Sequence, residues 1–130
     1  MMRVVVPGVP PSVNHMYRRF TVRGRTMDVI TREAQAWMQE VRTLAAGACT
    51  HAMWRCRPRG SKVRVRIWYY WPDRRRRDTH NTLKALLDAL EGIAYEDDRD
   101  ALPQVMDYAV DRGNPRIEML IDDLPEEATA

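Results

Sequence analysis

Side chains suited to metal chemistry gather between residues 71 and 98, where the chain reads WPDRRRRDTHNTLKALLDALEGIAYEDD. Asp78 and His80 lie two residues apart, so on an extended segment their side chains point the same way. Asp97 and Asp98 follow some twenty residues later. Such ligands suit Mg²⁺ or Mn²⁺ in an open site, where the ion neutralises a phosphodiester and activates a water. Taken singly, a DxH pair before a helix is more often only a cap, and an EDD turn is usually a solvated acidic loop.

Lys84 stands out because this chain otherwise uses arginine for positive charge. Of its 21 basic residues, only Lys62 and Lys84 are lysines. A compact ammonium can touch a phosphate oxygen or protonate a leaving group, for which a planar guanidinium is less suitable. The alternative for Lys84 is an ordinary helical ion pair with Asp88, four residues further on.

The distribution of charge separates two parts of the chain. Residues 1–77 hold 17 basic and 4 acidic residues, whereas residues 78–130 hold 4 and 14, leaving a net charge of only +3. A basic part suits a polyanion because neutralising phosphates releases counterions, and an acidic cluster suits a metal ion. The alternative is a solvated surface with unevenly spread charge.

The elements that must position these residues follow from periodicity and turn signals. We expect strands at 3–6, 63–71, 105–111 and 116–122, a hairpin over 17–30 around Arg23-Gly24-Arg25, and two helices. The first helix starts after the cap Thr31 and ends near Gly47, and the second runs from about Asn81 to Ala94. The last two strands would form a hairpin through the turn at 113–115. The sequence therefore predicts an α+β fold: a small, mostly antiparallel or mixed sheet with two main helices.

Length and composition limit the function classes. With 130 residues, we expect one domain over 1–124 and a loose acidic tail at 125–130. No apolar run is long enough to span a bilayer, and the N-terminus lacks a signal-peptide pattern. Two cysteines are too few for a disulfide framework. We therefore expect a cytoplasmic, nucleoid-associated protein with no membrane contact and no small-molecule cofactor.

The stretch from the arginine run to Asp98 resembles the core of the RusA family of Holliday junction resolvases. That family shows an Arg-rich turn, a DxDN element, a lysine four residues after its second Asp, a helix with DAL, and a closing DD. Here these are Arg74–Arg77, Asp78-Thr79-His80-Asn81, Lys84, Asp88-Ala89-Leu90 and Asp97-Asp98. The segment PPSVNHMYR at 10–18 resembles the family's PPSxNxxYR start, and VMDY at 105–108 resembles its strand after the acidic pair.

The resemblance implies a homodimer that nicks four-way DNA junctions symmetrically with Mg²⁺ or Mn²⁺, in recombination and repair. The catalytic residues it implies are Asp78, His80, Lys84 and Asp98, and the metal ligands are Asp78, His80, Asp97 and Asp98. The side chains expected to bind branched DNA are Asn14, Tyr17, Arg18, Arg64, Arg66, Arg74, Arg75, Arg76 and Arg77. Trp68 and Tyr70 would either stack on an unpaired base or lie in a subunit interface.

Two departures from the family pattern bear on activity. His80 stands where the pattern has a second Asp, and an imidazole, being neutral and softer, favours Mn²⁺ relative to Mg²⁺. Residues 99–103 look like an insertion before the next strand. Two alternative functions therefore stay open: a broader branched-DNA nuclease of phage origin, and a junction-binding protein whose catalysis His80 impairs.

Geometry poses one further question about the second helix. A helix over 81–94 would be about 20 Å long, whereas four extended residues reach back only about 13 Å. Either the helix ends early and the chain doubles back, or the two acidic ends meet across a dimer. A two-fold dimer also fits a substrate that is cut at two symmetry-related strands.

Overall fold

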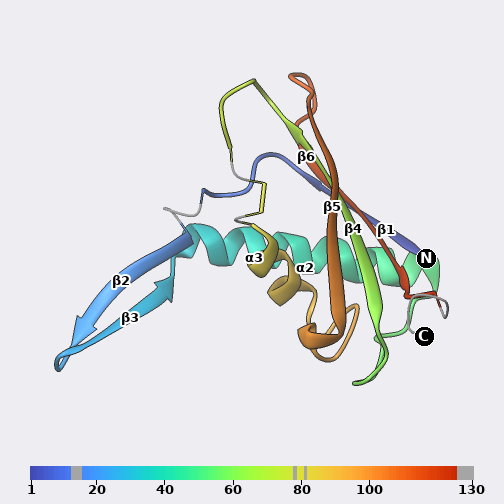
Figure 1. Ribbon diagram of the computed structural model, residues 1–130, viewed down its shortest axis with the longest axis horizontal. Coiled ribbons are helices and arrows are strands. Elements are labelled where there is room, and N and C mark those ends of the chain that lie inside the picture. Colours follow the sequence, from blue (N-terminus) through green and yellow to red (C-terminus); the bar gives the residue numbers. More distant parts are fainter. Residues whose placement is uncertain (13–15, 78, 81, 126–130) are drawn as a thin grey trace.

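The computed structural model describes residues 1–12, 16–77, 79–80 and 82–125, and it has the predicted α+β architecture (Figure 1). Its strands are β1 (Met2–Pro7), β2 (Tyr17–Val22), β3 (Arg25–Ile30), β4 (Val63–Trp71), β5 (Ala101–Val110) and β6 (Arg116–Asp123). Its helices are α2 (Arg32–Ala52), α3 (Leu83–Leu90) and the short 3-10 helix η1 (Asp98–Asp100). Residues 126–130, most of the expected tail, lie outside the described residues.

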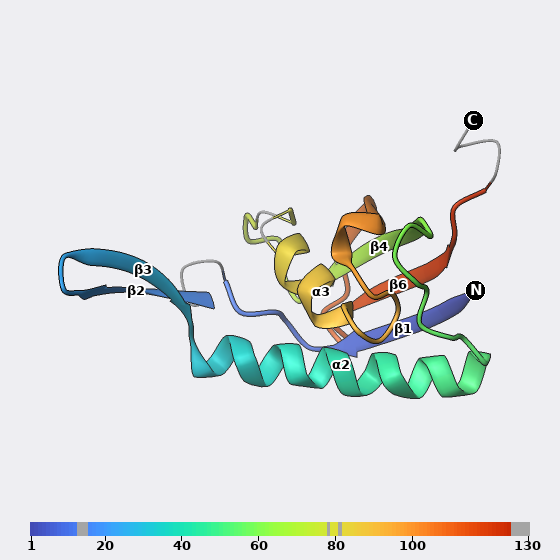
Figure 2. The same cartoon turned by 90° about the horizontal axis from the view of Figure 1, so that it is seen from below.

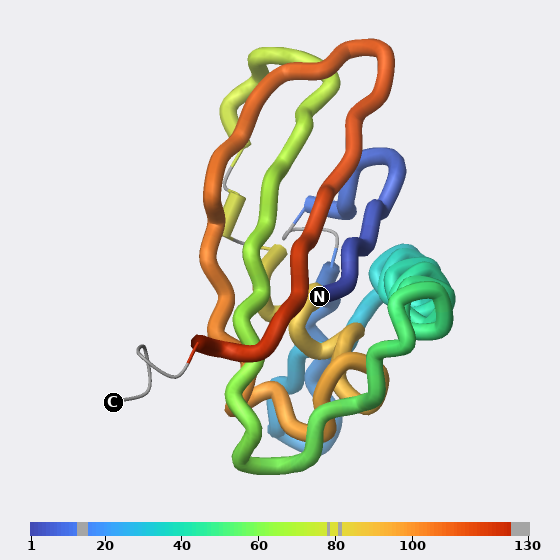
Figure 3. Tube along the Cα trace, turned by 90° about the vertical axis from the view of Figure 1, so that its right-hand side faces the viewer, coloured from blue at the N-terminus to red at the C-terminus, as the bar shows by residue number. Residues whose placement is uncertain are grey.

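The main sheet is mixed and has the strand order β1-β6-β4-β5, with β2 and β3 in a separate two-stranded sheet. Figure 3 traces the four strands side by side. β4 pairs antiparallel with β6 and parallel with β5. The predicted hairpin between the last two strands is therefore wrong, because β4 lies between β5 and β6. The reason is the crossover through α3, which returns the chain to the end of the sheet where β4 began.

The alternation predicted for β4 is confirmed and explains the core. Every second side chain from Val63 to Trp71 is buried, and the intervening ones are half-buried. The buried side packs with the inner faces of α2 and α3, in one hydrophobic cluster that also includes β1 and β6. Figure 2 shows both helices lying along the sheet. Strand β5 begins at residue 101, so the suspected insertion at 99–103 forms η1 and the start of an edge strand.

Helix α2 starts as predicted and ends later. Thr31 caps it, accepting a hydrogen bond from the Ala34 N–H at 3.2 Å. Gly47 does not end the helix, which continues to Ala52 and closes at Met53 in the left-handed conformation. The apolar stripe continues past the glycine, and burial of that stripe outweighs the modest cost of glycine in a helix.

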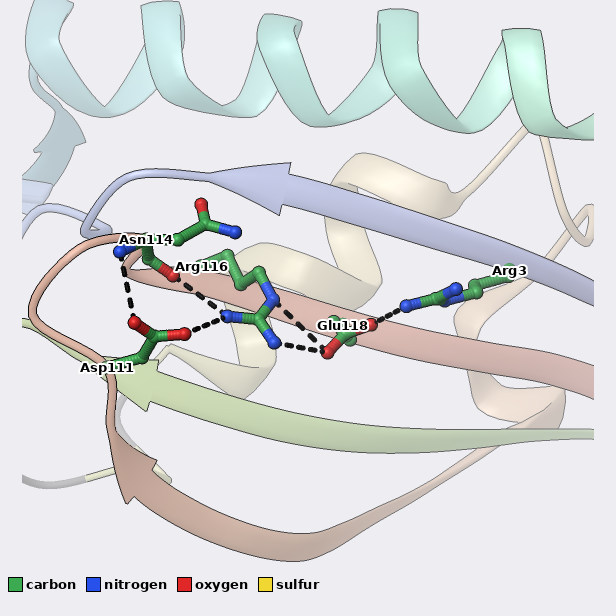
Figure 4. Close-up of polar contacts among 5 residues, drawn as sticks. All are labelled: Arg3, Asp111, Asn114, Arg116 and Glu118. Carbon is green, nitrogen blue, oxygen red and sulfur yellow. Dashed lines mark hydrogen bonds and ion pairs between the residues drawn. The ribbon is translucent and has the colours of Figure 1, made fainter.

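The face of the sheet opposite the core carries a network of charges around Arg116 (Figure 4). Arg116 pairs with Asp111 at 2.8 Å and Glu118 at 3.1 Å, and its guanidinium lies 3.8 Å from the centroid of the Tyr70 ring. Arg3 also pairs with Glu118 and holds the pKa of that carboxyl below its usual value. This network links β1, β4 and β6 on a face that the helices leave open.

No helix in the described part of the chain is both long enough and apolar enough to cross a bilayer.

Candidate functional site

Helix α3 is shorter than predicted, and its early end decides where the acidic residues lie. It spans Leu83–Leu90 rather than 81–94, so it is about 12 Å long at 1.5 Å per residue. Gly92 then adopts a φ of 85°, a value that strains other residues, and its N–H donates to the Tyr95 carbonyl at 2.7 Å. The helix thus ends early and the chain doubles back, while composite or adjacent sites at a dimer interface stay a prediction.

Two side chains from the region of α2 hold this reversal. The Arg42 guanidinium donates to the carbonyls of Ala89 at 3.0 Å and Glu91 at 3.1 Å. The buried Trp54 ring donates its N–H to the Ala94 carbonyl at 3.0 Å. Carbonyls at the end of a helix have no partner within it, so the Arg42 guanidinium supplies a donor to carbonyls at the end of α3. The Trp54 bond holds the segment that follows the helix.

Tyr95 fixes the reversal from inside. Its ring is buried, and its hydroxyl donates to the Leu87 carbonyl at 2.7 Å. Burial raises the pKa of the Tyr95 hydroxyl far above its usual value, so the group stays a proton donor. The backbone of residues 94–96 also pairs with Arg57. The Arg57 N–H donates to the Ala94 carbonyl, and the Arg57 carbonyl accepts from the Glu96 N–H. The path of residues 91–98 is thus fixed on both sides.

The reversal brings the Glu91 carboxylate to those of Asp97 and Asp98, which lie six and seven residues later in the sequence. Ligand atoms of Glu91, Asp97 and Asp98 all lie within 4.8 Å of one another. The Glu91 carboxylate accepts a hydrogen bond from the Asp98 N–H at 3.2 Å, while Asp97 caps η1 by accepting from the Arg99 N–H at 3.0 Å. Hard oxygen donors at this spacing match the ligands that Mg²⁺ and Mn²⁺ prefer.

Asp88 joins these carboxylates from α3, and we call Asp88, Glu91, Asp97 and Asp98 the acidic cluster. A hydrogen bond with Asp88 raises the pKa of Asp98, and burial and the neighbouring negative charges raise it further. Carboxyls this close resist ionising together in the absence of a cation. The acidic cluster therefore has the electrostatics of a cation site.

Lys84 lies at the edge of the acidic cluster. Its ammonium pairs with Asp88 at 3.2 Å, and its side chain is 75% exposed. The hydrogen bond to Asp88 is the main cause of a raised Lys84 pKa, with further contributions from the charges of Asp88, Tyr17 and Asp98. The ion pair between Lys84 and Asp88, which the sequence offered as the alternative to a catalytic role, is thus present. The same ammonium also lies near Asp98 and is accessible to a substrate.

His80 is described by the structure, whereas Asp78 lies outside the described residues. His80 is exposed in the turn before α3, where its carbonyl accepts from the Leu83 N–H at 3.2 Å. It lines a hollow of about 280 Å³ with Arg76, Arg77, Thr79 and Tyr108. Within the described residues, the group of closely spaced potential ligands contains Glu91, Asp97 and Asp98 and not His80.

The arginine turn presents most of its charge to solvent. Arg74, Arg75 and Arg76 are exposed. Arg77 differs, because it pairs with Asp73 at 2.7 Å and lies over the Trp71 ring at 5.1 Å from its centroid. The pairing with Arg77 lowers the pKa of Asp73. Arg77 thus holds the turn, and the three arginines before it are the ones available to phosphates.

The arginines of β4 are held within the protein on the open face of the sheet. Arg64 forms a two-pronged pair with Asp122, at 3.0 and 2.6 Å, and Arg66 contacts the same carboxylate at 3.4 Å. These contacts keep the pKa of Asp122 below its usual value. A DNA phosphate at Arg64 would have to compete with Asp122. Of the other expected DNA contacts, Tyr17 and Arg18 begin β2, and Asn14 lies outside the described residues.

Sequence reasoning missed Glu91 and assigned Asp88 only to a helical ion pair. The one available signal was Gly92, which ends helices by adopting a positive φ and lies directly after Glu91. A helix ending there brings position 91 back toward position 98. Treating Gly92 as near the end of a longer helix left the acidic residues at opposite ends.

Comparison of the sequence with known proteins identifies the family of this chain. The sequence model of the family described as "Endodeoxyribonuclease RusA" matches residues 7–122. The chain is 40% identical to a crossover junction endodeoxyribonuclease of Enterobacteria phage 82 over 101 residues, which are 78% of this chain and 74% of that protein. It is 32% identical to one from Escherichia coli O139:H28, over 91% of this chain and 92% of that protein. This chain therefore belongs to the RusA family of endodeoxyribonucleases.

Proposed function

We propose that this protein resolves four-way DNA junctions by paired, symmetric cleavage of phosphodiester bonds with a divalent metal ion, in DNA recombination and repair. The observation that carries the proposal is the convergence of Lys84 and the acidic cluster at one end of the chain reversal. Relatives described as crossover junction endodeoxyribonucleases support the choice of substrate. Because the substrate is DNA, we place the protein's work in the cytoplasm, at the nucleoid.

The acidic cluster fits Mg²⁺ or Mn²⁺. Glu91, Asp97 and Asp98 offer close oxygen donors, and a cation would relieve the negative charge that, after the contact with Asp88 and burial, contributes to the raised pKa of Asp98. We assign Asp97 and Asp98 as ligands, together with Asp78, which precedes α3 in the sequence. When bound, the ion supplies charge neutralisation at the phosphate and a more acidic water. Glu91 is the carboxylate that the structure adds to this set.

Lys84 and the arginines act on the phosphate itself. The Lys84 ammonium can leave Asp88 for a phosphate oxygen at little cost, because an exposed helical pair is worth only a few tenths of a kcal/mol. There it would stabilise the negative charge or protonate the leaving oxygen. Arg74, Arg75 and Arg76 would bind the flanking phosphates.

His80 sets the metal preference in this proposal. An imidazole in place of a carboxylate removes one negative charge and adds a softer donor, which shifts preference from Mg²⁺ toward Mn²⁺. His80 also lines the hollow that contains Arg76 and Tyr108. It therefore lies where it could contact either a metal ion or a phosphate bound by the arginine turn.

A homodimer is part of the proposal because the substrate has two symmetry-related strands to cut. The edge strand β5 supports it, since it exposes four large apolar side chains. These are Leu102, Met106, Tyr108 and Val110. An exposed apolar edge of this length generally finds a partner. An interface along β5 would adjoin the His80 hollow through Tyr108. Sedimentation showing an active monomer at assay concentration would contradict this part.

The decisive experiment is cleavage of a synthetic four-way junction with Mg²⁺, Mn²⁺ or no metal, beside a fork and a linear duplex. Paired cuts confined to the junction support the proposal. Equal cutting of the fork would indicate the alternative function, a broader branched-DNA nuclease of phage origin. Binding without cleavage in either metal would indicate a junction-binding protein, and an Asp78→Asn variant that still cleaves would exclude the proposed site.

A further inference from the structure

Strands β2 and β3 form an arm that projects from the body of the protein (Figures 1 and 2). They pair with each other and form a sheet separate from the main one. Two-stranded hairpins are marginally stable in water when nothing packs on them. The arm is anchored at its base, where the Thr31 N–H donates to the Met16 carbonyl at 2.9 Å. The rest of its surface is therefore open to a partner.

One face of the arm is apolar and exposed. The register pairs Phe20 with Met27, Arg18 with Val29, and Val22 with Arg25, so these six side chains share a face. The four apolar members are between 43% and 52% exposed. Apolar residues gathered on one side of a projecting ribbon mark an interaction surface.

The charge of the arm indicates the kind of partner. It carries Arg18, Arg19, Arg23 and Arg25 against the single acidic residue Asp28, which lies 3.7 Å from Arg19. Within the part of the chain that the structure describes, the other three form no ion pair. This excess of positive charge attracts a polyanion and opposes packing against a second arm.

The tip of the arm presents one of these charges in an unusual way. Arg23 and Gly24 form a two-residue turn with φ values of 52° and 76°. Turns with both central φ values positive favour Asn, Asp or Gly at the first position. Arg23 therefore has a backbone conformation that residues with long side chains rarely adopt. Its place in the turn puts a positively charged residue at the tip of the arm.

The base of the arm adjoins the proposed active site. Tyr17, the first residue of β2, lies near enough to Lys84 for its charge to affect the lysine's pKa. A hollow of about 860 Å³ lies where the arm meets α2, and its lining includes Arg18, Phe20, Val29 and Arg32. A nucleic-acid strand that reaches Lys84 could thus continue along the arm.

We propose that the apolar face of the β2–β3 arm holds a strand of the branched DNA next to the cleavage site. Phe20 and Met27 contact the faces of bases left unpaired at the branch point, as apolar side chains do when they enter a base stack. Arg18 and Arg25, at the two ends of the same face, contact phosphates. This assignment rests on the proposed function, because it takes branched DNA as the substrate.

The test compares F20A/M27A with the control T21A/T26A, whose threonines lie on the opposite face and contact each other at 3.3 Å. Each full-length variant is titrated with a fluorescent four-way junction in Ca²⁺, and its molar mass is measured by light scattering. We expect F20A/M27A to bind roughly tenfold more weakly, the usual order for losing a base–aromatic contact, while the control binds as the wild type does. A 2-aminopurine at the crossover should be quenched by the wild type and the control, and less by F20A/M27A.

A second variant, R18Q/R25Q, keeps the proposal testable if the alanine variant misfolds. It should reduce the slope of log Kd against log salt by about two, close to one for each lost phosphate contact. Unchanged binding by both variants would overturn the proposal. So would weaker binding that accompanies loss of a dimer, because the arm would then contact a second copy. A wild type that binds through the arm but cuts in neither Mg²⁺ nor Mn²⁺ would refute only the proposed function.

Discussion

The Asp98 N–H donates a hydrogen bond to the Glu91 carboxylate at 3.2 Å across the chain reversal that follows α3, and the neighbouring Asp88 carboxyl raises the pKa of Asp98. Asp88 also accepts from the Lys84 ammonium at 3.2 Å. Carboxyls held this close without a cation disfavour ionising together, which favours the protonated form of one of them. A cation at the acidic cluster would relieve this repulsion, so its binding should displace the proton of Asp98 wherever that carboxyl is protonated.

Binding of Mn²⁺ should release a proton, and the amount should depend on pH. The pKa of Asp98 is raised in the folded protein, so protonation of Asp98 favours the metal-free fold at low pH, and this contribution is lost as pH rises through the raised pKa. Metal affinity should therefore rise over the same interval and then level off. Titration calorimetry in two buffers of different ionisation enthalpy measures the protons released.

The variant Asp88→Asn tests the cause of this proton release. An amide at position 88 can donate to an ionised Asp98, which lowers the pKa of Asp98 and shifts proton release to lower pH. Asp28→Asn on the arm removes the same charge far from the acidic cluster and should behave as the wild type. Identical profiles for Asp88→Asn and the wild type would show that Asp88 does not control Asp98.

Replacing His80 by Asp should raise cleavage supported by Mg²⁺ more than cleavage supported by Mn²⁺. A carboxylate is the harder ligand, and an improvement of about 1.4 kcal/mol in metal binding corresponds to roughly a tenfold gain. Rates with each metal at subsaturating concentration measure the change. His51→Asp, at the far end of α2, adds the same charge elsewhere. A gain of equal size in both variants would assign the effect to net charge rather than to a ligand at position 80.

Replacing Lys84 by Met should lower the rate of junction cleavage roughly 100-fold or more, as expected for loss of a proton donor or a charge in the transition state. Lys84→Arg should restore little, because a guanidinium cannot replace a compact ammonium at one oxygen. Single-turnover cleavage at saturating enzyme separates this effect from weaker binding. If Lys84 served only its pair with Asp88, both variants would cleave normally, and only Lys84→Met would lose the few tenths of a kcal/mol that the pair contributes to stability.

Replacing Arg42 by Met should loosen the reversal that carries Glu91. The variant loses two charge-assisted bonds to carbonyls, at Ala89 and Glu91, which costs about 1–3 kcal/mol of unfolding free energy. Mn²⁺ affinity should fall as well, although Arg42 bears no ligand atom. Thermal unfolding and Mn²⁺ titration measure the two effects. Arg32→Met, in the first turn of the same helix, is the control, and an unchanged Mn²⁺ affinity in Arg42→Met would contradict a positioning role.

Several features of this protein follow from local sequence. The alternation in β4 predicts which of its side chains are buried, because side chains on a strand point alternately to the two faces. Thr31 predicts the start of α2, and Arg23-Gly24 predicts the turn of the arm. The motif from the arginine run to Asp98 predicts the family and its candidate chemistry. Each of these depends on neighbours within a few residues, or on a pattern of residue types.

Only the tertiary structure decided which of these residues meet. Glu91 joins Asp98 because α3 ends at Leu90 and packing by Tyr95 returns the chain. Arg64 lies against Asp122 because β6, and not β5, follows β4 on that side of the sheet. Periodicity reports which side of an element is buried, but it carries no information on the partner that covers it. That choice depends on the free energy of packing the whole core, to which residues distant in sequence contribute together.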